Sequence, residues 1–218
     1  MRHAFCLLAA VALLAFAPVP VLAQKPTRKP PADGTEFKLS PDAPKHATAD
    51  VEFRDPSPGD GARWPNFCYG KPTAPGTFTF HSQKPAGAFA VACDKMAQKL
   101  GDQSRRVLGD IAPEGQPPAV AFALTRCGEV RPIDKPEKNG PKEQFPAEGT
   151  LTVGPRTVSV KGTGTWAFQY GKDGEFPESL SLTFAFDVKG ADLGLKAPEV
   201  VRVTARVVAY KELPAGKK

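Results

Sequence analysis

The chain has 218 residues and a formal net charge of +6, from 29 Lys and Arg against 23 Asp and Glu. The basic residues are scattered among acidic ones and form no stripe interleaved with aromatics, so nucleic acid is not an expected partner. We interpret the mild positive charge as an aid to solubility, and weak attraction to an anionic lipid surface is the alternative.

Residues 1–23 are predicted to be a secretory signal peptide. Arg2 and His3 form a basic start, Ala4 to Phe16 is apolar without a charge, and Val21-Leu22-Ala23 places small or apolar residues where a signal peptidase reads. The apolar run is shorter than the ~20 residues of a membrane span. We therefore expect a periplasmic or secreted protein with no transmembrane segment after signal removal, and an uncleaved anchor is the alternative.

The rest of the chain is expected to form one domain. Residues 24–36 are predicted to be a Pro-rich linker in which nothing is buried, because its prolines block helix and sheet alike. Residues 37–212 are predicted to be a β-barrel domain, and residues 213–218 a flexible tail.

Alternation of apolar and polar residues predicts an all-β fold. In Leu180–Val188 every second residue is large and apolar, so one face of that strand is apolar. With few helical patterns nearby, such a sheet buries its apolar face by closing on itself, which predicts an all-β barrel. Strands are expected at Glu36–Leu39, Thr48–Arg54, Thr77–His81, Ala88–Cys93, Ala119–Arg126, Thr150–Val153, Thr157–Lys161, Gly164–Tyr170, Leu180–Val188 and Val200–Tyr210.

Three segments qualify this pattern. Thr157 to Tyr170 is alternatively one long strand bent at Gly162 and Gly164, because glycines in strands often mark barrel corners. Asp94 to Ile111 has apolar residues at roughly helical spacing and predicts a short helical insertion. Residues 131–145 are rich in charge and proline and predict a solvated loop.

The sequence contains no recognisable catalytic or metal-binding set. After residue 23 it has only His46 and His81, and neither has a second ligand at metal-binding spacing. Nucleophile-elbow, phosphate-loop and dinucleotide-binding motifs are absent. We therefore expect no enzyme activity, no metal and no cofactor, and rank a hydrolase with an unrecognised site third among the functional readings.

Three cysteines follow the predicted signal: Cys68, Cys93 and Cys127. An oxidising compartment permits a disulfide, and an odd number leaves one thiol over; three unpaired buried thiols are the alternative. If Thr77–His81 and Ala88–Cys93 form a hairpin, Cys68 can return to Cys93, whereas Cys127 lies about eight residues or roughly 26 Å away. A disulfide requires Cα atoms within about 7 Å, so the pattern predicts Cys68–Cys93 with Cys127 unbonded.

Several stretches also carry a family resemblance. Gly149–Val153 and Thr157–Val160 look like paired strands around a small turn, Phe186–Leu195 looks like a strand running into an Asp-Phe-Gly segment, and Val200–Tyr210 looks like a closing strand. Further matches are Gly76–Phe80, Ala88–Asp94, Arg105–Leu108 and Pro118–Leu124. In this order they resemble the YceI-like family of exported lipid-binding barrels. The chain departs from that pattern at Arg106, where the family has Asp, and at Leu193, where it has Phe.

The resemblance implies an antiparallel, lipocalin-like barrel that encloses a polyisoprenoid or similar long apolar chain for periplasmic carriage or storage, with no catalytic residues. The ligand would be held by inward apolar side chains, which we expect to be Phe78, Phe80, Phe89, Val91, Phe122, Leu124, Val158, Val160, Trp166, Phe168, Leu182, Phe184, Phe186, Val203 and Val207. The alternative is a structural or interaction β-protein with a filled core, which acts through loops such as Trp64 to Tyr69.

Overall fold

The computed structural model describes residues 27–41, 49–57, 59, 61–96, 106–111, 118–138, 140–172 and 174–212. The predicted signal peptide at residues 1–23, His46 and the predicted tail at residues 213–218 lie outside this set, so those predictions remain predictions.

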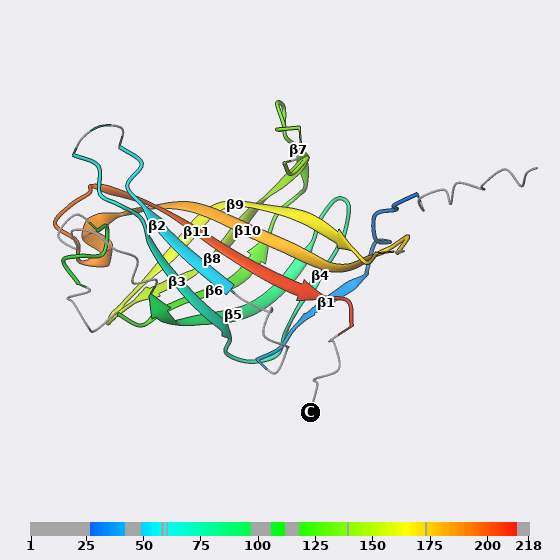
Figure 1. Cartoon of the computed structure of the whole chain (residues 1–218), viewed down its shortest axis with the longest axis horizontal. Coiled ribbons are helices and arrows are strands. Elements are labelled where there is room, and N and C mark those ends of the chain that lie inside the picture. The colour runs from blue at the N-terminus through cyan, green and yellow to red at the C-terminus, as the bar shows by residue number, and fades with distance from the viewer. Residues whose placement is uncertain are drawn as a thin grey trace, which may run out of the picture.

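The described residues form one antiparallel sheet that closes into a barrel (Figure 1). Its strands are β1 (Glu36–Leu39), β2 (Ala49–Arg54), β3 (Asn66–Pro72), β4 (Gly76–Thr79), β5 (Ala86–Met96), β6 (Val120–Cys127), β7 (Arg131–Pro132), β8 (Glu143–Val153), β9 (Arg156–Tyr170), β10 (Pro177–Lys189) and β11 (Val200–Tyr210). The only helix in this part of the chain is the 3-10 turn η2 (Gly190–Leu193).

Eight strands make the closed ring, in the order β5, β3, β2, β11, β10, β9, β8 and β6, with β6 pairing back onto β5. The pair β1–β4 completes the wall where β2 and β3 end. Thus β5 pairs with β4 over Ala86–Ala88 and with β3 over Val91–Met96. In the same way β11 pairs with β2 as far as Val207 and with β1 at Tyr210. The wall therefore keeps eight strands from end to end, which confirms the predicted all-β antiparallel barrel.

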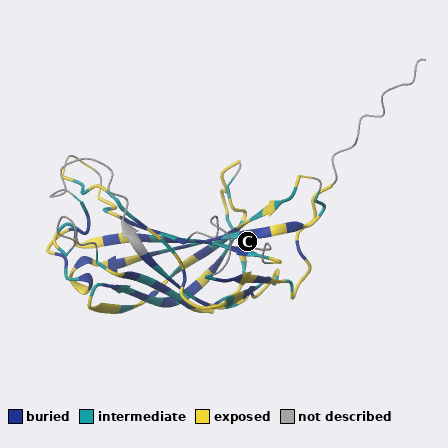
Figure 2. Cartoon of the chain, turned by 60° about the horizontal axis from the view of Figure 1, so that its bottom comes forward, coloured by how far each residue is buried: buried dark blue, intermediate teal, exposed yellow. Residues whose placement is uncertain are grey.

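The predicted alternation decides which side chains enter the barrel. Along β10, Leu180, Leu182 and Phe184 are buried, whereas Ser181 and Thr183 between them are partly exposed. Buried and exposed positions alternate in the same way along the other long strands (Figure 2). Burial of each inward Leu or Phe contributes roughly 1.5–3 kcal/mol, so the alternation carries most of the driving force for closure.

Strand positions were predicted well where the alternation is strong. The strands β1, β2, β4, β5, β6, β10 and β11 all lie where they were expected, within a few residues. Thr157 to Tyr170 belongs to one continuous strand, β9, as the single-strand alternative had it. The prediction missed β3, whose inward positions include Gly70 and Pro72 in place of large apolar residues.

Two predictions about irregular segments were wrong. Residues 131–145 are not all loop, because β7 lies within them and β8 begins at Glu143. The described parts of Asp94–Ile111 contain no helix: Asp94 to Met96 extend β5, and residues 106–111 form a short bridge and turns. The apolar residues of that second part, Val107 and Leu108, are spaced for burial against one end of the barrel and not for a helix face.

The predicted linker is also partly packed on the barrel. Residues Thr27–Gly34, here called the N-terminal strap, precede β1, and Pro31 within it is buried. The prediction that nothing in residues 24–36 is buried was therefore wrong. A proline that blocks regular structure still presents an apolar ring, which can pack against a neighbouring surface.

The structure contains no Cys68–Cys93 disulfide; Cys68, Cys93 and Cys127 are thiols and are buried. Cys68 does lie near Cys93, as predicted, because their strands β3 and β5 are paired. Cys127 lies at the other end of β6 from Val120, the residue that pairs with Cys93. The register explains the missing bond. Cys93 faces Gly70 and Cys68 faces Met96, so the two cysteines are diagonal neighbours. Diagonal positions are typically 7–8 Å apart, beyond the usual Cα separation of a disulfide.

Burial changes the acidity of these thiols. Desolvation raises the pKa of Cys127 to about 12, and desolvation together with the nearby Cys93 raises the pKa of Cys68 to about 12. The thiolate is the reactive form of cysteine, so at neutral pH both side chains behave as small apolar groups in the wall.

A glycine on β9 makes room for an aromatic ring inside the barrel. Phe145 on β8 lies directly across from Gly164, and a Cβ atom at position 164 would lie 2.4–3.0 Å from three carbons of the Phe145 ring. The ring thus covers the bare backbone of the glycine, a pairing that also favours curvature of the wall.

We expect Gly164→Ala to destabilise the protein by roughly 1–3 kcal/mol, because the new methyl group forces the buried Phe145 ring out of its position. Urea denaturation measures this. The control is Gly61→Ala, since a Cβ there meets nothing within 4 Å. Equal stability of the two variants would show that Phe145 does not occupy the space above Gly164.

On the outer wall, one carboxylate is buried between two arginines. Glu52 on β2 is 5% exposed. Its Oε1 accepts hydrogen bonds from the Arg54 Nε and Nη2 atoms at 3.0 and 2.6 Å, and its Oε2 accepts one from Arg206 at 3.1 Å. Arg206 also donates to Asp50 at 2.8 Å. Burial acts to raise the pKa of Glu52, but the two arginines outweigh it and the pKa lies below its ordinary value of 4.5.

We expect Glu52→Gln to cost roughly 1–3 kcal/mol at neutral pH, because it removes one charge of a buried network. A depressed folded-state pKa stabilises the protein above pH 4.5 and loses this effect as the pH falls through the folded value. The difference in free energy of unfolding between the wild-type protein and the variant should therefore be smaller near pH 4 than at pH 7, as measured by denaturation. In the control Asp187→Asn, which breaks the exposed pair with Arg202, the loss should stay below about 1 kcal/mol.

Candidate ligand-binding interior

The barrel interior brings together most of the residues predicted to contact a ligand. Thirteen of the fifteen are buried, and the other two, Val158 and Phe168, are partly buried and pack against the same cluster. The predicted set omitted interior side chains of comparable size. These are Phe37, Phe53, Phe145, Leu151 and Leu180. Phe145 was missed because it lies in the predicted loop, although Phe145, Ala147, Gly149, Leu151 and Val153 continue the alternation back from the predicted strand.

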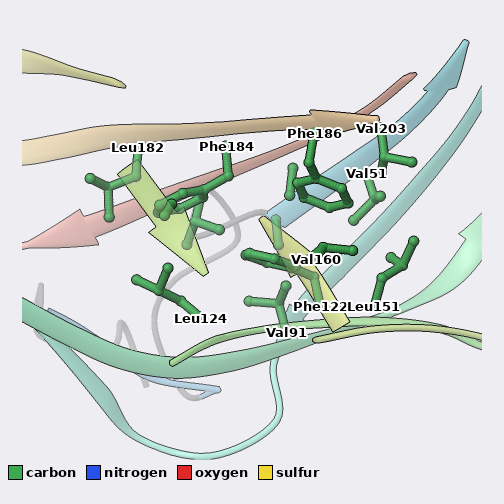
Figure 3. Packing of buried hydrophobic residues seen from close by; sticks show 14 of the residues in the cluster. Val51, Val91, Phe122, Leu124, Leu151, Val160, Leu182, Phe184, Phe186 and Val203 are labelled. Carbon is green, nitrogen blue, oxygen red and sulfur yellow. The ribbon is translucent and has the colours of Figure 1, made fainter. Parts of the chain in front are cut away.

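Four rings fill the middle of the barrel. Phe89 on β5 and Phe184 on β10 come from opposite sides of the eight-stranded ring, yet their centroids are 5.8 Å apart. Phe122 on β6 contacts both rings and stacks on Phe186 at 5.6 Å. Figure 3 shows Phe184 and Phe186 on β10 pointing toward Phe122 on the facing wall. At this level, side chains of the protein meet across the barrel axis.

A second group of rings occupies one end of the barrel, here called the aromatic end. Trp166 on β9 contacts Phe78, Phe80, Phe145 and Phe168 at centroid distances of 5.2–6.5 Å. Trp166 is 4% exposed, whereas Phe168, two residues further toward the end of β9, is only partly buried. The aromatic end is therefore the part of the described interior where large apolar side chains approach solvent.

The N-terminal strap lies at this same end. The Lys29 backbone N–H donates to Glu175 O at 2.9 Å, and the Lys29 ammonium also pairs with the Glu175 carboxylate. The Tyr170 hydroxyl donates to Lys29 O at 3.1 Å. At the other end of the strap, Gly34 N–H donates to Phe80 O at 2.9 Å. The strap thus connects the turn between β9 and β10 to the residues that follow β4 (Figure 1).

One acidic side chain reaches the aromatic rings. Glu143, the first residue of β8, lies on the inward side of that strand together with Phe145 and Ala147, and it is partly buried. Its Oε2 accepts a hydrogen bond from the Trp166 indole N–H at 3.1 Å. No ion-pair partner of Glu143 is found among the described residues. The aromatic end therefore combines an apolar surface with a single interior carboxylate.

The opposite end of the barrel is covered by aliphatic side chains. Val107 and Leu108 are fully buried, and the Leu108 N–H donates to the Asn66 side chain at 2.9 Å. From the other side, Leu193 of η2 and the nearby Leu195 are buried as well. We call this the capped end. Residues 106–111, predicted as helix, act here as a short cover.

Outside the barrel, a concavity of about 670 Å³ lies beside the loop between β2 and β3. Its lining includes Arg54, Asp55, Arg63 and Trp64. Trp64 is 52% exposed, and the Arg106 guanidinium lies 5.8 Å from its ring centroid. Arg63 is paired with Asp110 at 3.2 Å. The two arginines of the lining, Arg54 and Arg63, are thus bonded to carboxylates of the protein.

Among the described residues, no group of three His, Cys, Asp or Glu side chains is arranged to hold a metal ion. His81 accepts hydrogen bonds from the backbone N–H groups of Gln83 and Lys84 and lies 3.7 Å from Asp33, in an exposed turn. No helix in the described part of the chain is long and apolar enough to span a membrane.

Comparisons with known proteins find one distant structural likeness to report. No protein-family model matches the chain, and no curated protein matches it. Among solved structures, the crystal structure of Burkholderia cenocepacia BcnA is similar with 16% sequence identity and a TM-score of 0.44, covering 74% of this chain and 96% of that one. A likeness this distant carries no information about function. The resemblance to the YceI-like family stays a prediction from the sequence.

The two tryptophans provide a test of the interior, since Trp166 is buried among rings and Trp64 is half exposed. We expect the Trp64→Phe variant, which retains Trp166, to emit at shorter wavelength and to resist quenching by iodide. The Trp166→Phe variant should emit at longer wavelength and be quenched readily. Similar quenching of both variants would contradict the buried position of Trp166.

Proposed function

We propose that the protein binds a long apolar molecule, with an isoprenoid chain as the favoured class, inside its barrel. The observation that carries this proposal is the chemistry of the interior, which is apolar on every wall of the ring and rich in aromatic rings. The resemblance to exported isoprenoid-binding barrels, noted from the sequence, supports the choice of ligand. Carriage or storage outside the cytoplasm, in the periplasm or after secretion, is part of the same proposal and depends on the predicted signal peptide.

A ligand in the middle of the barrel would have to replace the contacts among the central rings. Four ring contacts join Phe89, Phe122, Phe184 and Phe186. Each such contact contributes about 0.5–1.5 kcal/mol beyond area burial, and each buried CH2 contributes about 0.8 kcal/mol. Burial of roughly three to eight CH2 groups would thus offset the loss of these four ring contacts, provided that the rings stay buried after they move. A C20 or longer chain has enough carbon for this exchange.

The aromatic end is the favoured route of access. Phe168 is partly exposed there, whereas Val107, Leu108 and Leu193 cover the capped end. The N-terminal strap covers this end through backbone hydrogen bonds of Lys29 and Gly34, two hydrogen bonds from Ser82 to Asp33, and a Lys29–Glu175 pair that is about half exposed. Access at this end would require displacement of the strap, and the exposed ion pair adds little to the cost of that step.

A second candidate is an interaction protein with a filled core. The contact of Phe89 and Phe184 across the axis favours it, because side chains already fill the centre in the absence of a ligand. Trp64 and Tyr69, which are 52% and 47% exposed, would then supply the contact surface. The two candidates make opposite predictions for uptake of an apolar chain.

The deciding experiment uses squalene, an isoprenoid hydrocarbon with no polar end. Delipidated protein is incubated with squalene, and the bound fraction is measured by mass spectrometry after gel filtration. We expect about one molecule per barrel. Correctly folded protein that takes up neither squalene nor another lipid would refute the proposal and favour the interaction protein.

Phe184→Asp is expected to abolish squalene loading, because an unpaired carboxylate in an apolar interior costs several kcal/mol. Thr183→Asp is the matched control, since Thr183 lies on the outer side of the same strand across from Arg206, and it should load normally. Circular dichroism checks the fold of both variants. Because Phe184→Asp can unfold the barrel, Phe184→Leu serves as a second variant. It removes one central ring and should load faster if the rings obstruct the chain, whereas unchanged loading would contradict this role.

A further inference from the structure

We propose that Glu143 and Trp166 form a site for the polar end of the ligand, and that this site selects a hydroxyl-ended chain over a phosphate-ended or carboxylate-ended one. The inference rests on the proposed function and adds the chemistry of the ligand's end to it. It concerns the aromatic end of the barrel, where the chain would be threaded.

The position of Glu143 is the first step. It continues the inward row of Phe145 and Ala147 on β8, so its side chain extends from the rim toward the barrel interior. Trp166, to which it is bonded at 3.1 Å, is 4% exposed and is surrounded by phenylalanine rings. The carboxylate thus lies where an apolar chain and solvent would meet, a suitable place for the single polar group of an otherwise apolar ligand.

The hydrogen bond to Trp166 fixes the orientation of this group. An indole N–H is a donor only, and it uses Oε2 of Glu143. A carboxylate has about four acceptor positions, so Glu143 retains capacity to accept a further hydrogen bond from a ligand. A hydroxyl group can donate this bond. A carboxylate or a doubly ionised phosphate cannot donate, and any anionic end would be repelled by the like charge at close range in an apolar setting.

Two cations at this end, Lys29 and Arg28, belong to the N-terminal strap and are already engaged. Lys29 pairs with Glu175 and lies 5.9 Å from the Phe176 ring centroid. Arg28 lies over the Tyr170 ring at 5.1 Å. Neither forms an ion pair with Glu143 in the structure. An anionic ligand end that displaced the contact with Tyr170 would pair with Arg28, and this gives the test a clear competing outcome.

The test compares geranylgeraniol with geranylgeranyl monophosphate, two probes with the same chain. Binding to the full protein is measured by equilibrium dialysis. We expect the wild-type protein to bind the alcohol at least tenfold more tightly. Glu143→Gln keeps the size of the side chain and an oxygen that can accept from Trp166, but it removes the charge. The preference should fall to threefold or less, mainly because the phosphate binds more tightly.

Glu137→Gln is the matched control. It removes the same charge from an exposed residue of the arm between β7 and β8, and it should leave the preference unchanged. Circular dichroism confirms that both variants fold. An unchanged preference in Glu143→Gln would overturn the inference.

A wild-type preference for the phosphate that is lost in Arg28→Gln would also overturn it, by assigning the ligand's end to the strap. If squalene is bound but neither end group is discriminated, the proposed function stands and this inference fails. If none of the three probes binds, the proposed function fails and the inference with it.

Discussion

Closure of the hydrogen-bonded wall is the constraint on which the rest of this structure depends. Once β6 pairs with β5, successive residues of each strand point alternately into the barrel and away from it. The interior then has room only for apolar side chains, and charged groups are confined to the outer surface and the two ends. The Asp50, Glu52, Arg54 and Arg206 network on the outside and the phenylalanine rings inside are two results of one alternation.

The ends differ because different residues cover them. At the capped end, aliphatic side chains from residues 106–111 and η2 are buried, and the cover is joined to the wall through Asn66. At the aromatic end, aromatic rings take the place of the aliphatic side chains, Phe168 is partly exposed, and Glu143 introduces a charge. The two ends therefore differ in chemistry, and under the proposed function a chain with one polar end would enter in one orientation.

The sequence was most informative where packing and local pattern agree. The alternation of Leu180 to Val188 predicted β10 and its inward residues, because a strand buried on one side must alternate. The pattern failed where another requirement replaced it. In β3, Gly70 approaches the backbone of Ala92 too closely for any side chain, so no apolar residue marks the inward position. Val107 and Leu108 were predicted to belong to a helix, but they are buried because they cover a barrel end.

The candidate site was predictable only in its apolar part. Phe184 and Trp166 follow from the period of their strands, but Glu143 does not, because proline and charge around it are typical of a loop. Its role depends on the contact with Trp166, which is 23 residues away in the sequence. Likewise, no local pattern reports that Phe89 and Phe184 meet across the axis, since that distance depends on the diameter of the closed ring.

β1 and β4 form a short section of the wall, here called the panel β1–β4, which few residue pairs join to the neighbouring strands. β10 and β11 are joined along eleven residue pairs, whereas β1 is joined to β4 by four and to β11 by one, and β4 is joined to β5 by three. Local opening needs only the hydrogen bonds of the opening segment to break, so it is easiest where the pairings are fewest. The panel β1–β4 also carries the N-terminal strap and lies at the aromatic end. Any sideways opening of the wall would therefore begin at this place, while the longer ladders hold the rest of its circumference closed.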